Sequence, residues 1–259
     1  MPADRLFQDV PTFVLVFFRT ASMLLSAPLF GSARIPRMVK VLMALVLALG
    51  VMPGVAGPNP RPDTPWALAL GIGGEIIFGA ALGLGLTFTF VAVTWAGGMI
   101  GQQLGFNLGE TFDPQFGGGA SVVGDLYAML TLVIFLLIRG HHVLIRSLRD
   151  SFDALPLMSV GMTRSLFELL LGLLQAATLL AFRMAAPVLV TMLIVDLALG
   201  FLGKTMPQFN LMSSGISIRS VMGMVVLIIG ISLTNATIRG ALVDSLDSMQ
   251  LAWNGIGSQ

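Results

Sequence analysis

Charged residues are scarce in this chain of 259 residues, and cysteine is absent. Asp, Glu, Lys and Arg make up 10% of the sequence, whereas hydrophobic residues make up 56%. A soluble domain carries roughly a quarter charged residues, so this chain cannot cover itself with a solvated surface. Its mean hydropathy of +0.91 agrees with that conclusion. The composition therefore predicts an integral membrane protein.

Further absences exclude or disfavour several functional classes. Without cysteine the chain has no disulfide, no thiolate metal ligand and no thiol nucleophile. A net charge of +1 provides no basic field for nucleic acid. The only histidines, His141 and His142, are adjacent, and neighbouring helix positions point about 100° apart, so such a pair rarely binds one metal. We find no Ser/His/Asp arrangement, HExxH motif or phosphate-binding loop, and we expect no enzymatic activity, metal or cofactor.

Long apolar regions predict an all-α membrane protein, because a spanning helix needs about 20 apolar residues. Six such regions cover residues 11–30, 39–55, 66–100, 122–138, 165–202 and 216–238. The third and fifth are too long for one perpendicular span, so each must tilt, break or extend beyond the bilayer. Pro187 lies in the fifth region, where it removes a backbone donor. We expect long, broken helices and helical hairpins.

Polar connectors separate these regions. Residues 57–65, with the sequence GPNPRPDTP, are expected to be extended and non-helical. Residues 139–164 form a long connector of mixed charge, and residues 203–215 form a polar hairpin connector. The tail that begins at Arg239 is expected to be amphipathic, because four apolar residues recur at helical spacing, namely Leu242, Leu246, Met249 and Trp253.

The distribution of basic residues gives an inconsistent topology. Arg34, Arg37 and Lys40 would place the first connector in the cytoplasm. With six simple spans, the arginine-rich connector at residues 139–164 would then lie outside. Either the number of spans is wrong or the helices do not cross the membrane in the ordinary way.

Five charged residues interrupt the apolar regions. Each would cost several kcal/mol if it faced lipid without a partner. One interpretation is an ion or proton pathway, and the other is pairing between helices or with partner subunits. We favour pairing, because the sequence has no acidic cluster of the kind expected in a pump. The five residues are Arg19, Glu75, Arg183, Asp196 and Arg219.

The connector at residues 101–125 is the most unusual segment of the chain. Its sequence is GQQLGFNLGETFDPQFGGGASVVGD, which contains no Lys or Arg and lies between two very apolar regions. Loops of about 20 residues are usually functional or disordered. Non-helical backbone persists at membrane depth only where protein encloses it or where it lines an aqueous cavity. Bulky phenylalanines beside a flexible triple glycine suit a movable plug, and a disordered exposed loop is an equal alternative.

Two long segments resemble the FliR family of flagellar biosynthetic proteins. The first reads GFNLGETFDPQFGGGASVVGDLY, followed by apolar residues 128–138 and by RGHHVLIRSLRDSF. The second reads AAPVLVTMLIVDLALGFLGKTMPQFNLMSSGISIRS and covers residues 185–220. The resemblance extends over nearly the whole chain in order and spacing. Injectisome proteins share this architecture, but the sequence around residues 113–119 is more similar to the flagellar proteins.

The resemblance implies a non-enzymatic subunit of the type III secretion export gate. Members of the family assemble with FliP and FliQ into a helical pore at the centre of the basal body. Residues 1–160 would be FliP-like and contain the plug loop at about residues 102–124, and residues 161–259 would be a FliQ-like hairpin with the amphipathic tail. Other expected partners are an FlhB-type gate protein, unfolded export substrates and inner-membrane lipids, but not nucleic acid. The complex would lie displaced toward the periplasm, which would explain the inconsistent topology.

The resemblance also assigns roles to individual residues. The plug of the closed pore would consist of Phe106, Phe112, Asp113, Phe116, Gly117, Gly118 and Gly119. Buried polar groups, including Arg183, Asp196, Gln208 and Asn210, would pair mainly with neighbouring subunits. Two alternatives to the flagellar function stay open, namely an injectisome homologue and a small-solute transporter with broken helices.

Overall fold

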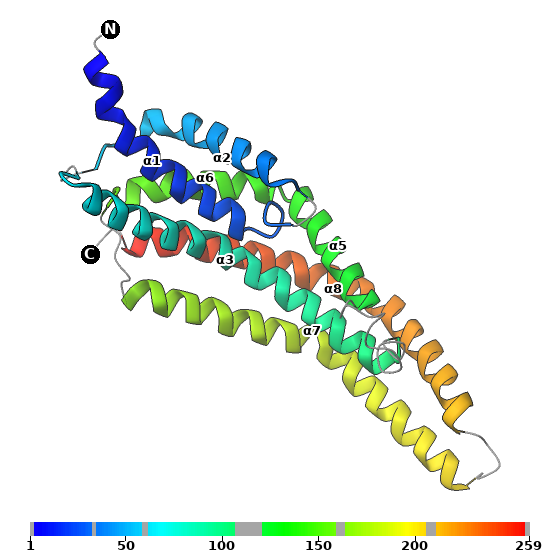
Figure 1. The fold of residues 1–259 in the computed structure, drawn as a ribbon. Coiled ribbons are helices and arrows are strands. Elements are labelled where there is room, and N and C mark those ends of the chain that lie inside the picture. Colours follow the sequence, from blue (N-terminus) through cyan, green and yellow to red (C-terminus); the bar gives the residue numbers. More distant parts are fainter. Residues whose placement is uncertain are drawn as a thin grey trace. The chain divides into compact units, whose positions relative to one another are not determined.

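A computed structural model describes residues 3–32, 35–58, 62–106, 121–158, 164–205 and 211–256. Every regular element in these ranges is a helix, which confirms the all-α class (Figure 1). The elements are α1 (Ala3–Ser26), α2 (Arg37–Val51), the 3₁₀-helix η1 (Met52–Gly54), α3 (Pro65–Leu104), α5 (Val122–Leu137), α6 (Gly140–Ala154), α7 (Arg164–Thr205) and α8 (Leu211–Ile256).

The two longest apolar regions form continuous helices. Helix α3 has 40 residues and α7 has 42, so each is about 60 Å long at 1.5 Å per residue. Pro187 lies inside α7, where its carbonyl accepts a hydrogen bond of 2.7 Å from the Thr191 hydroxyl. Because the hydrocarbon core is about 30 Å thick, both helices must tilt or extend beyond it.

The number of candidate spans is smaller than the six apolar regions. Three helical stretches in the described ranges are long and apolar enough to cross a membrane, namely Arg37–Gly54, Pro65–Leu104 and Leu170–Thr205. The number rises to five if two bent helix pairs count as one span each, Val122–Leu137 with Gly140–Ala154 and Ser217–Ile231 with Thr234–Ser248. The topology from six simple spans therefore used too many spans.

The connector of mixed charge at residues 139–164 contains a helix that the sequence analysis did not predict. Helix α6 follows directly on α5, and Arg139 between them adopts a left-handed backbone with φ 56°. Its buried face contains Leu144, Leu148 and Phe152, which recur four residues apart. Charged residues on the remaining faces lowered the hydrophobicity of the segment and obscured this periodicity.

Two shorter predictions agree with the structure. The described residues of the segment 57–64 are not helical, as the prolines predicted. The tail belongs to α8, and Leu242 and Leu246 are buried on one face of it. The side chains of Met249 and Trp253 lie outside the described residues.

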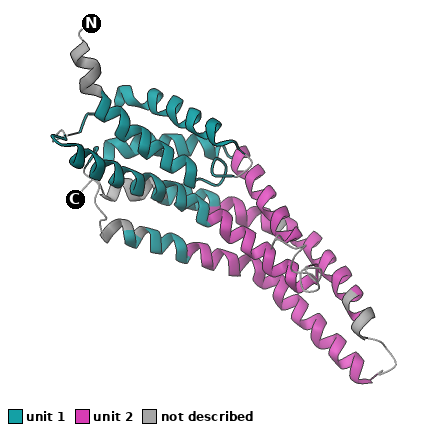
Figure 2. Ribbon diagram, in the orientation of Figure 1, with its two compact units in different colours: residues 1–88, 138–175, 242–259 teal, residues 89–137, 176–241 magenta. Residues whose placement is uncertain are grey.

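The chain divides into two compact units (Figure 2). Unit 1 contains residues 1–88, 138–175 and 242–259, and unit 2 contains residues 89–137 and 176–241. Helices α3, α7 and α8 each contribute residues to both units. The predicted boundary at residue 160 concerns similarity to FliP and FliQ, which is a separate question and stays a prediction.

Unit 1 has one hydrophobic core. Buried side chains from α1, α2, α3 and α6 form it, with Leu157 beyond the end of α6. The members of this core are Leu15, Val16, Met23, Leu24, Ala27, Ala44, Ala48, Phe78, Ala81, Leu82, Leu144, Leu148, Phe152 and Leu157. Burial of these apolar side chains stabilises the helices against one another.

Helices α1 and α3 approach each other closely through glycine. A Cβ atom at Gly79 would lie 2.2 Å from the carbonyl oxygen of Arg19, and one at Gly83 would lie 2.5 Å from that of Met23. The Thr87 hydroxyl, one turn further along α3, donates hydrogen bonds to the carbonyl oxygens of Ser26 and Gly83. Small residues that permit such backbone contact are typical of membrane helix pairs.

Replacing Gly79 with alanine is expected to lower the free energy of unfolding by about 1–3 kcal/mol, because the new methyl group would overlap backbone atoms of α1. The matched control is Gly73→Ala in the same helix, where a Cβ atom meets nothing within 4 Å. Alanine should be neutral or stabilising there by up to about 1 kcal/mol. Thermal unfolding of the purified chain in mild detergent measures both. Equal effects would contradict the close contact of α1 with α3.

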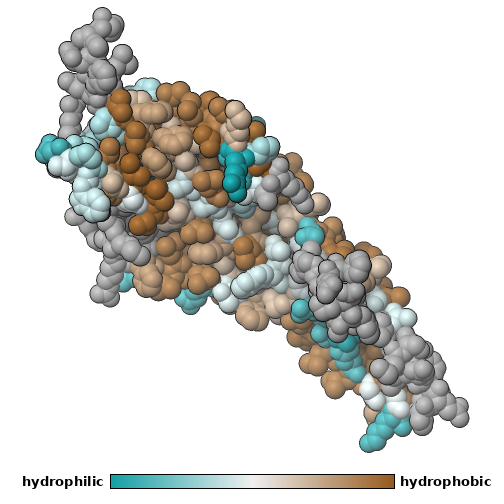
Figure 3. Space-filling model, viewed as in Figure 1, coloured by the Kyte–Doolittle hydropathy of each residue, from teal (hydrophilic) through white to brown (hydrophobic). Residues whose placement is uncertain are grey.

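The surface of the chain is apolar over large areas (Figure 3). Helix α2 exposes a whole apolar face, on which Met38 is 74% and Val46 is 64% exposed. Helices α7 and α8 expose further large apolar side chains, such as Leu197 and Ile229. Contiguous patches of this kind mark contact with lipid or with other proteins. The chain is a membrane protein.

Candidate functional site

The unusual connector begins where α3 ends, and a glycine forms that end. Gly105 has φ 78°, a backbone conformation that glycine adopts without strain. The amide of Gly105 donates to the carbonyl of Gln102, and the amide of Phe106 donates to that of Gly101, both at 3.1 Å. This is a glycine cap of the kind that commonly terminates helices. The chain therefore leaves α3 in a defined direction.

Helix α8 supplies partners for the last carbonyl groups of α3, which have no partner within their own helix. The Arg219 Nε donates to the carbonyl oxygen of Gln103 at 2.6 Å. The Ser220 hydroxyl donates to the carbonyl oxygen of Leu104 at 3.1 Å. Two consecutive residues of α8 thus hold the end of α3.

Helix α7 adds a carboxylate to the same cluster. Asp196 Oδ2 accepts a hydrogen bond from Gln103 Nε2 at 3.2 Å and lies 3.2 Å from Arg219 Nη2. The side chains of Asp196 and Arg219 are each 33% exposed. We call Gln103, Asp196, Arg219 and Ser220 the anchor cluster. It joins α3, α7 and α8 within unit 2 and neutralises two charges that would otherwise face an apolar environment.

The other end of the connector is also fixed on α3. The Ser121 hydroxyl accepts a hydrogen bond from the amide of Gly124 at 3.3 Å, which caps the start of α5. At Gly97 of α3, a Cβ atom would lie 2.7 Å from the Cα atom of Gly124. The two glycines therefore allow α5 and α3 to touch through their backbones. Both ends of the segment 107–120 are held on the same part of α3.

A groove lies beside these two ends. It has a volume of about 490 Å³, and residues of α3, α5 and α7 line it, including Trp95, Gln102, Ser121 and Asp125. Within the described ranges, no three His, Cys, Asp or Glu side chains come together to hold a metal. The adjacent rings of His141 and His142 lie 4.3 Å apart, tilted against each other. The arrangement suits a mechanically held segment rather than bond-making chemistry.

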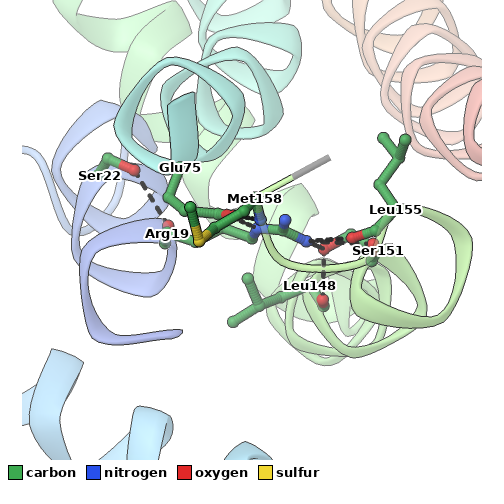
Figure 4. A network of polar contacts seen from close by, with 7 residues as sticks. All are labelled: Arg19, Ser22, Glu75, Leu148, Ser151, Leu155 and Met158. Atoms are coloured by element: carbon green, nitrogen blue, oxygen red, sulfur yellow. Dashed lines mark hydrogen bonds and ion pairs between the residues drawn. The ribbon is translucent and has the colours of Figure 1, made fainter. Parts of the chain in front are cut away.

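A second polar network lies at the centre of unit 1 (Figure 4). Arg19 of α1 and Glu75 of α3 form an ion pair, and neither side chain is exposed to solvent. Arg19 Nη1 donates to the carbonyl oxygens of Ser151 and Leu155, each at 3.1 Å. The second carboxylate oxygen of Glu75 accepts the amide of Met158 at 3.0 Å. One ion pair thus fixes α1, α3 and the end of α6 together.

Comparison with known proteins identifies the family. The family model described as bacterial export proteins, family 1, matches residues 10–244 of the chain. The chain belongs to this family. It is 27% identical over 244 residues to the flagellar biosynthetic protein FliR of Bacillus subtilis, with 93% of each chain covered. It is 30% identical over 212 residues to that of Escherichia coli, covering 79% of this chain and 78% of the relative. The corresponding protein of Pectobacterium carotovorum is also 30% identical, over 224 residues, covering 84% and 83%.

The resemblance to the FliR family is therefore confirmed, and the chain is a membrane protein of the flagellar export family. The structure places its predicted site residues unevenly. Of the predicted plug residues, Phe106 is described and is 37% exposed. The others lie outside the described residues, namely Phe112, Asp113, Phe116, Gly117, Gly118 and Gly119. Their role as a plug stays a prediction.

The predicted polar contacts fall into three groups. The structure pairs Arg19 with Glu75 and Asp196 with Arg219, whereas Arg183 is exposed on α7. Gln208 and Asn210 lie outside the described residues. The sequence analysis missed Gln103, Ser220, Ser151 and the amide of Met158, which complete the two networks. No sequence signal marks these partners, because they are separated from the charges by up to 132 residues.

Replacing Asp196 with asparagine is expected to loosen the end of α3. Asparagine retains an oxygen that accepts from Gln103 but removes the charge opposite Arg219. Because the pair is partly exposed, the expected loss is about 0.5–1 kcal/mol, or roughly a two- to fivefold faster hydrogen exchange of the Gly105 and Phe106 amides. Asp244→Asn, at an exposed carboxylate of α8 in unit 1, is the control. Identical exchange at both amides in the two variants would rule out this role for Asp196.

Proposed function

We propose that this chain is a subunit of the flagellar type III secretion export gate. With FliP and FliQ homologues it would form the pore through which unfolded flagellar proteins cross the bacterial inner membrane. The observation that carries the proposal is the family match over residues 10–244, together with relatives named flagellar biosynthetic protein FliR. The apolar exposed faces of α2, α7 and α8 support it, since a pore subunit has to contact both lipid and neighbouring subunits.

The chain would act in this pore as the carrier of a plug. The segment 107–120 would occlude the closed pore, with phenylalanines as blocking groups and the triple glycine as a hinge. The anchor cluster and the contact of Gly97 with Gly124 support this role, because a plug needs both ends fixed to a rigid support. An FlhB-type protein would complete the gate, and energy would come from other parts of the machine.

The proposed location is the inner membrane at the centre of the basal body, with the complex displaced toward the periplasm. The lengths of α3 and α7 support this displacement, since each is about twice the thickness of the hydrocarbon core. Helices that extend past the bilayer need not obey the topology rule for short loops.

Removal of the chain from its native cell should abolish secretion of flagellar filament protein into the medium, and the wild-type chain should restore it. The purified chain in liposomes should take up no small solute, since it would be one part of a larger channel. Quantitative immunoblotting of culture supernatants measures the first effect, and radiolabelled solute flux measures the second. Normal secretion without the chain, or solute uptake by the chain alone, would refute the export function.

A further inference from the structure

Arg183 stands at one end of a groove in unit 2 that the proposed function does not use. The groove has a volume of about 360 Å³ and lies on α5, α7 and α8. Most of its lining is apolar, and six of the residues that form it are Tyr127, Met184, Pro187, Val188, Leu227 and Gly230. Arg183 is the single charged residue in this lining.

Arg183 differs from the other charges of the long helices in having no protein partner. Asp196 and Arg219 neutralise each other within the chain. Arg183 is exposed, and it makes no hydrogen bond or ion pair with any of the residues that the structure describes. A cation in apolar surroundings is costly without a counter-charge. An anion from outside the chain is therefore required.

The groove is polar at one end and apolar along its length. Helices α7 and α8 run antiparallel, and Asp196 lies beside Arg219. Arg183 precedes Asp196 by 13 residues, so it lies near the level of residue 232 of α8. Thr234 is next to that level, and its hydroxyl contacts the Tyr127 hydroxyl at 3.4 Å. Val188 and Leu227 lie toward the opposite end, so the guanidinium and these hydroxyl groups occupy one end.

The apolar part has the dimensions of a lipid chain segment. From Arg183 to Thr191, the groove follows α7 for eight residues, which is about 12 Å at 1.5 Å per residue. The Thr191 hydroxyl bonds to the carbonyl of Pro187, so it offers no free donor to a ligand. At Gly230 a Cβ atom would meet nothing within 4 Å, which leaves the floor of the groove open.

The position of Arg183 along α7 fits the level of lipid headgroups. Lys204, in the last turn of α7, follows Arg183 by 21 residues, a distance of about 32 Å along the helix. This length matches the hydrocarbon thickness of about 30 Å. Two basic residues thus bracket one apolar stretch, as expected if each lies near a headgroup region.

We propose that this groove binds a net-anionic phospholipid, with its phosphodiester on Arg183 and one acyl chain along α7 and α8. Guanidinium forms strong bidentate hydrogen bonds with phosphate, and basic pockets between membrane helices bind anionic headgroups. The lining contains no Asp or Glu to receive the ammonium of a zwitterionic headgroup. The lipid replaces the neighbouring subunit that the sequence analysis expected as the partner of Arg183.

Native mass spectrometry of the full chain in mild detergent tests this proposal. The probes are palmitoyl-oleoyl phosphatidylglycerol and phosphatidylcholine with the same acyl chains. The wild-type chain should retain phosphatidylglycerol in preference. Arg183→Met should weaken that binding about tenfold or more, since it removes a charge-assisted hydrogen bond, and Arg183→Lys should retain most of it. Gly230→Leu should also weaken binding, because it fills the groove and leaves the charge in place.

Arg239→Met is the matched control, because Arg239 is an exposed arginine of α8 in unit 2 that does not line the groove. It should bind phosphatidylglycerol like the wild type. Equal losses in the Arg183 and Arg239 variants would show non-specific attraction and overturn the proposal. Unchanged binding by Arg183→Met would also overturn it. A third contrary result would be unchanged lipid binding with loss of a co-purifying subunit, which would assign Arg183 to a subunit carboxylate.

Discussion

Replacing Glu75 with alanine is expected to lower the free energy of unfolding by about 3–5 kcal/mol, because it leaves a buried arginine without its counter-charge. Arg19 is completely buried, so water cannot take over the lost interaction. The guanidinium lies between the rings of Phe78 and Phe152, at 4.8 and 4.4 Å from their centres. These rings stabilise a cation but cannot neutralise it. A loss of this size removes a large part of the stability of a typical domain.

A double variant separates the charge from the packing. Arg19→Met with Glu75→Leu removes both charges and leaves apolar groups of similar size, so it should be more stable than Glu75→Ala alone. Recovery should be incomplete, because the carbonyl oxygen of Leu155 loses its donor from Arg19 and the amide of Met158 loses its acceptor.

Thermal unfolding of the purified chains in one detergent measures these differences. The control is Asp247→Ala, at an exposed carboxylate of α8 in unit 1, which should stay within about 0.5 kcal/mol of the wild type. If Glu75→Ala were as mild as this control, the ion pair would not stabilise unit 1. A double variant less stable than either single variant would show that hydrogen bonding, rather than charge balance, dominates the network.

Deleting residues 112–119 is expected to open a conducting path for ions across the inner membrane. On the proposed function, this deletion removes two of the blocking phenylalanines and the glycine hinge, while the anchor cluster and the cap at Ser121 stay in place. The pore would therefore assemble normally but fail to close. The measurement is the membrane potential of living cells, followed with a voltage-sensitive dye.

Two further variants distinguish a plug from a tether. Phe112→Ser with Phe116→Ser keeps the length of the segment and should also increase the leak, because it removes the bulk that blocks the pore. Replacing Glu110 with glutamine changes a polar residue of the same segment without loss of bulk and should leave the potential unchanged. Normal potential in the deletion variant, with the complex recovered in normal amounts, would favour the disordered-loop alternative.

The sequence predicted the helices of this fold well where hydrophobicity alone determines them. The apolar regions at residues 66–100 and 165–202 lie within α3 and α7 because no other backbone conformation satisfies its polar groups in lipid. Helix α6 was missed because its apolar face is narrow and its other faces are charged. Local composition averages those faces, whereas the folded chain separates them.

The polar networks were harder to predict for a different reason. Arg19 and Glu75 stood out as charges in apolar segments, but they are 56 residues apart, and only the close packing of α1 on α3 brings them together. Gln103 and Ser220 carried no signal at all, since a polar residue near the end of an apolar helix is ordinary. Their role depends on the carbonyl groups and charges that tertiary structure places beside them.

The export-gate function itself is tested most directly by the composition of the complex that contains this chain. The measurement is the intact mass of the assembly purified from native cells in mild detergent through a tag on this chain, followed by dissociation into its subunits. The proposed function predicts one large assembly that releases this chain together with FliP and FliQ homologues. Recovery of the chain only as a monomer or homodimer, under conditions that preserve other membrane complexes, would contradict it.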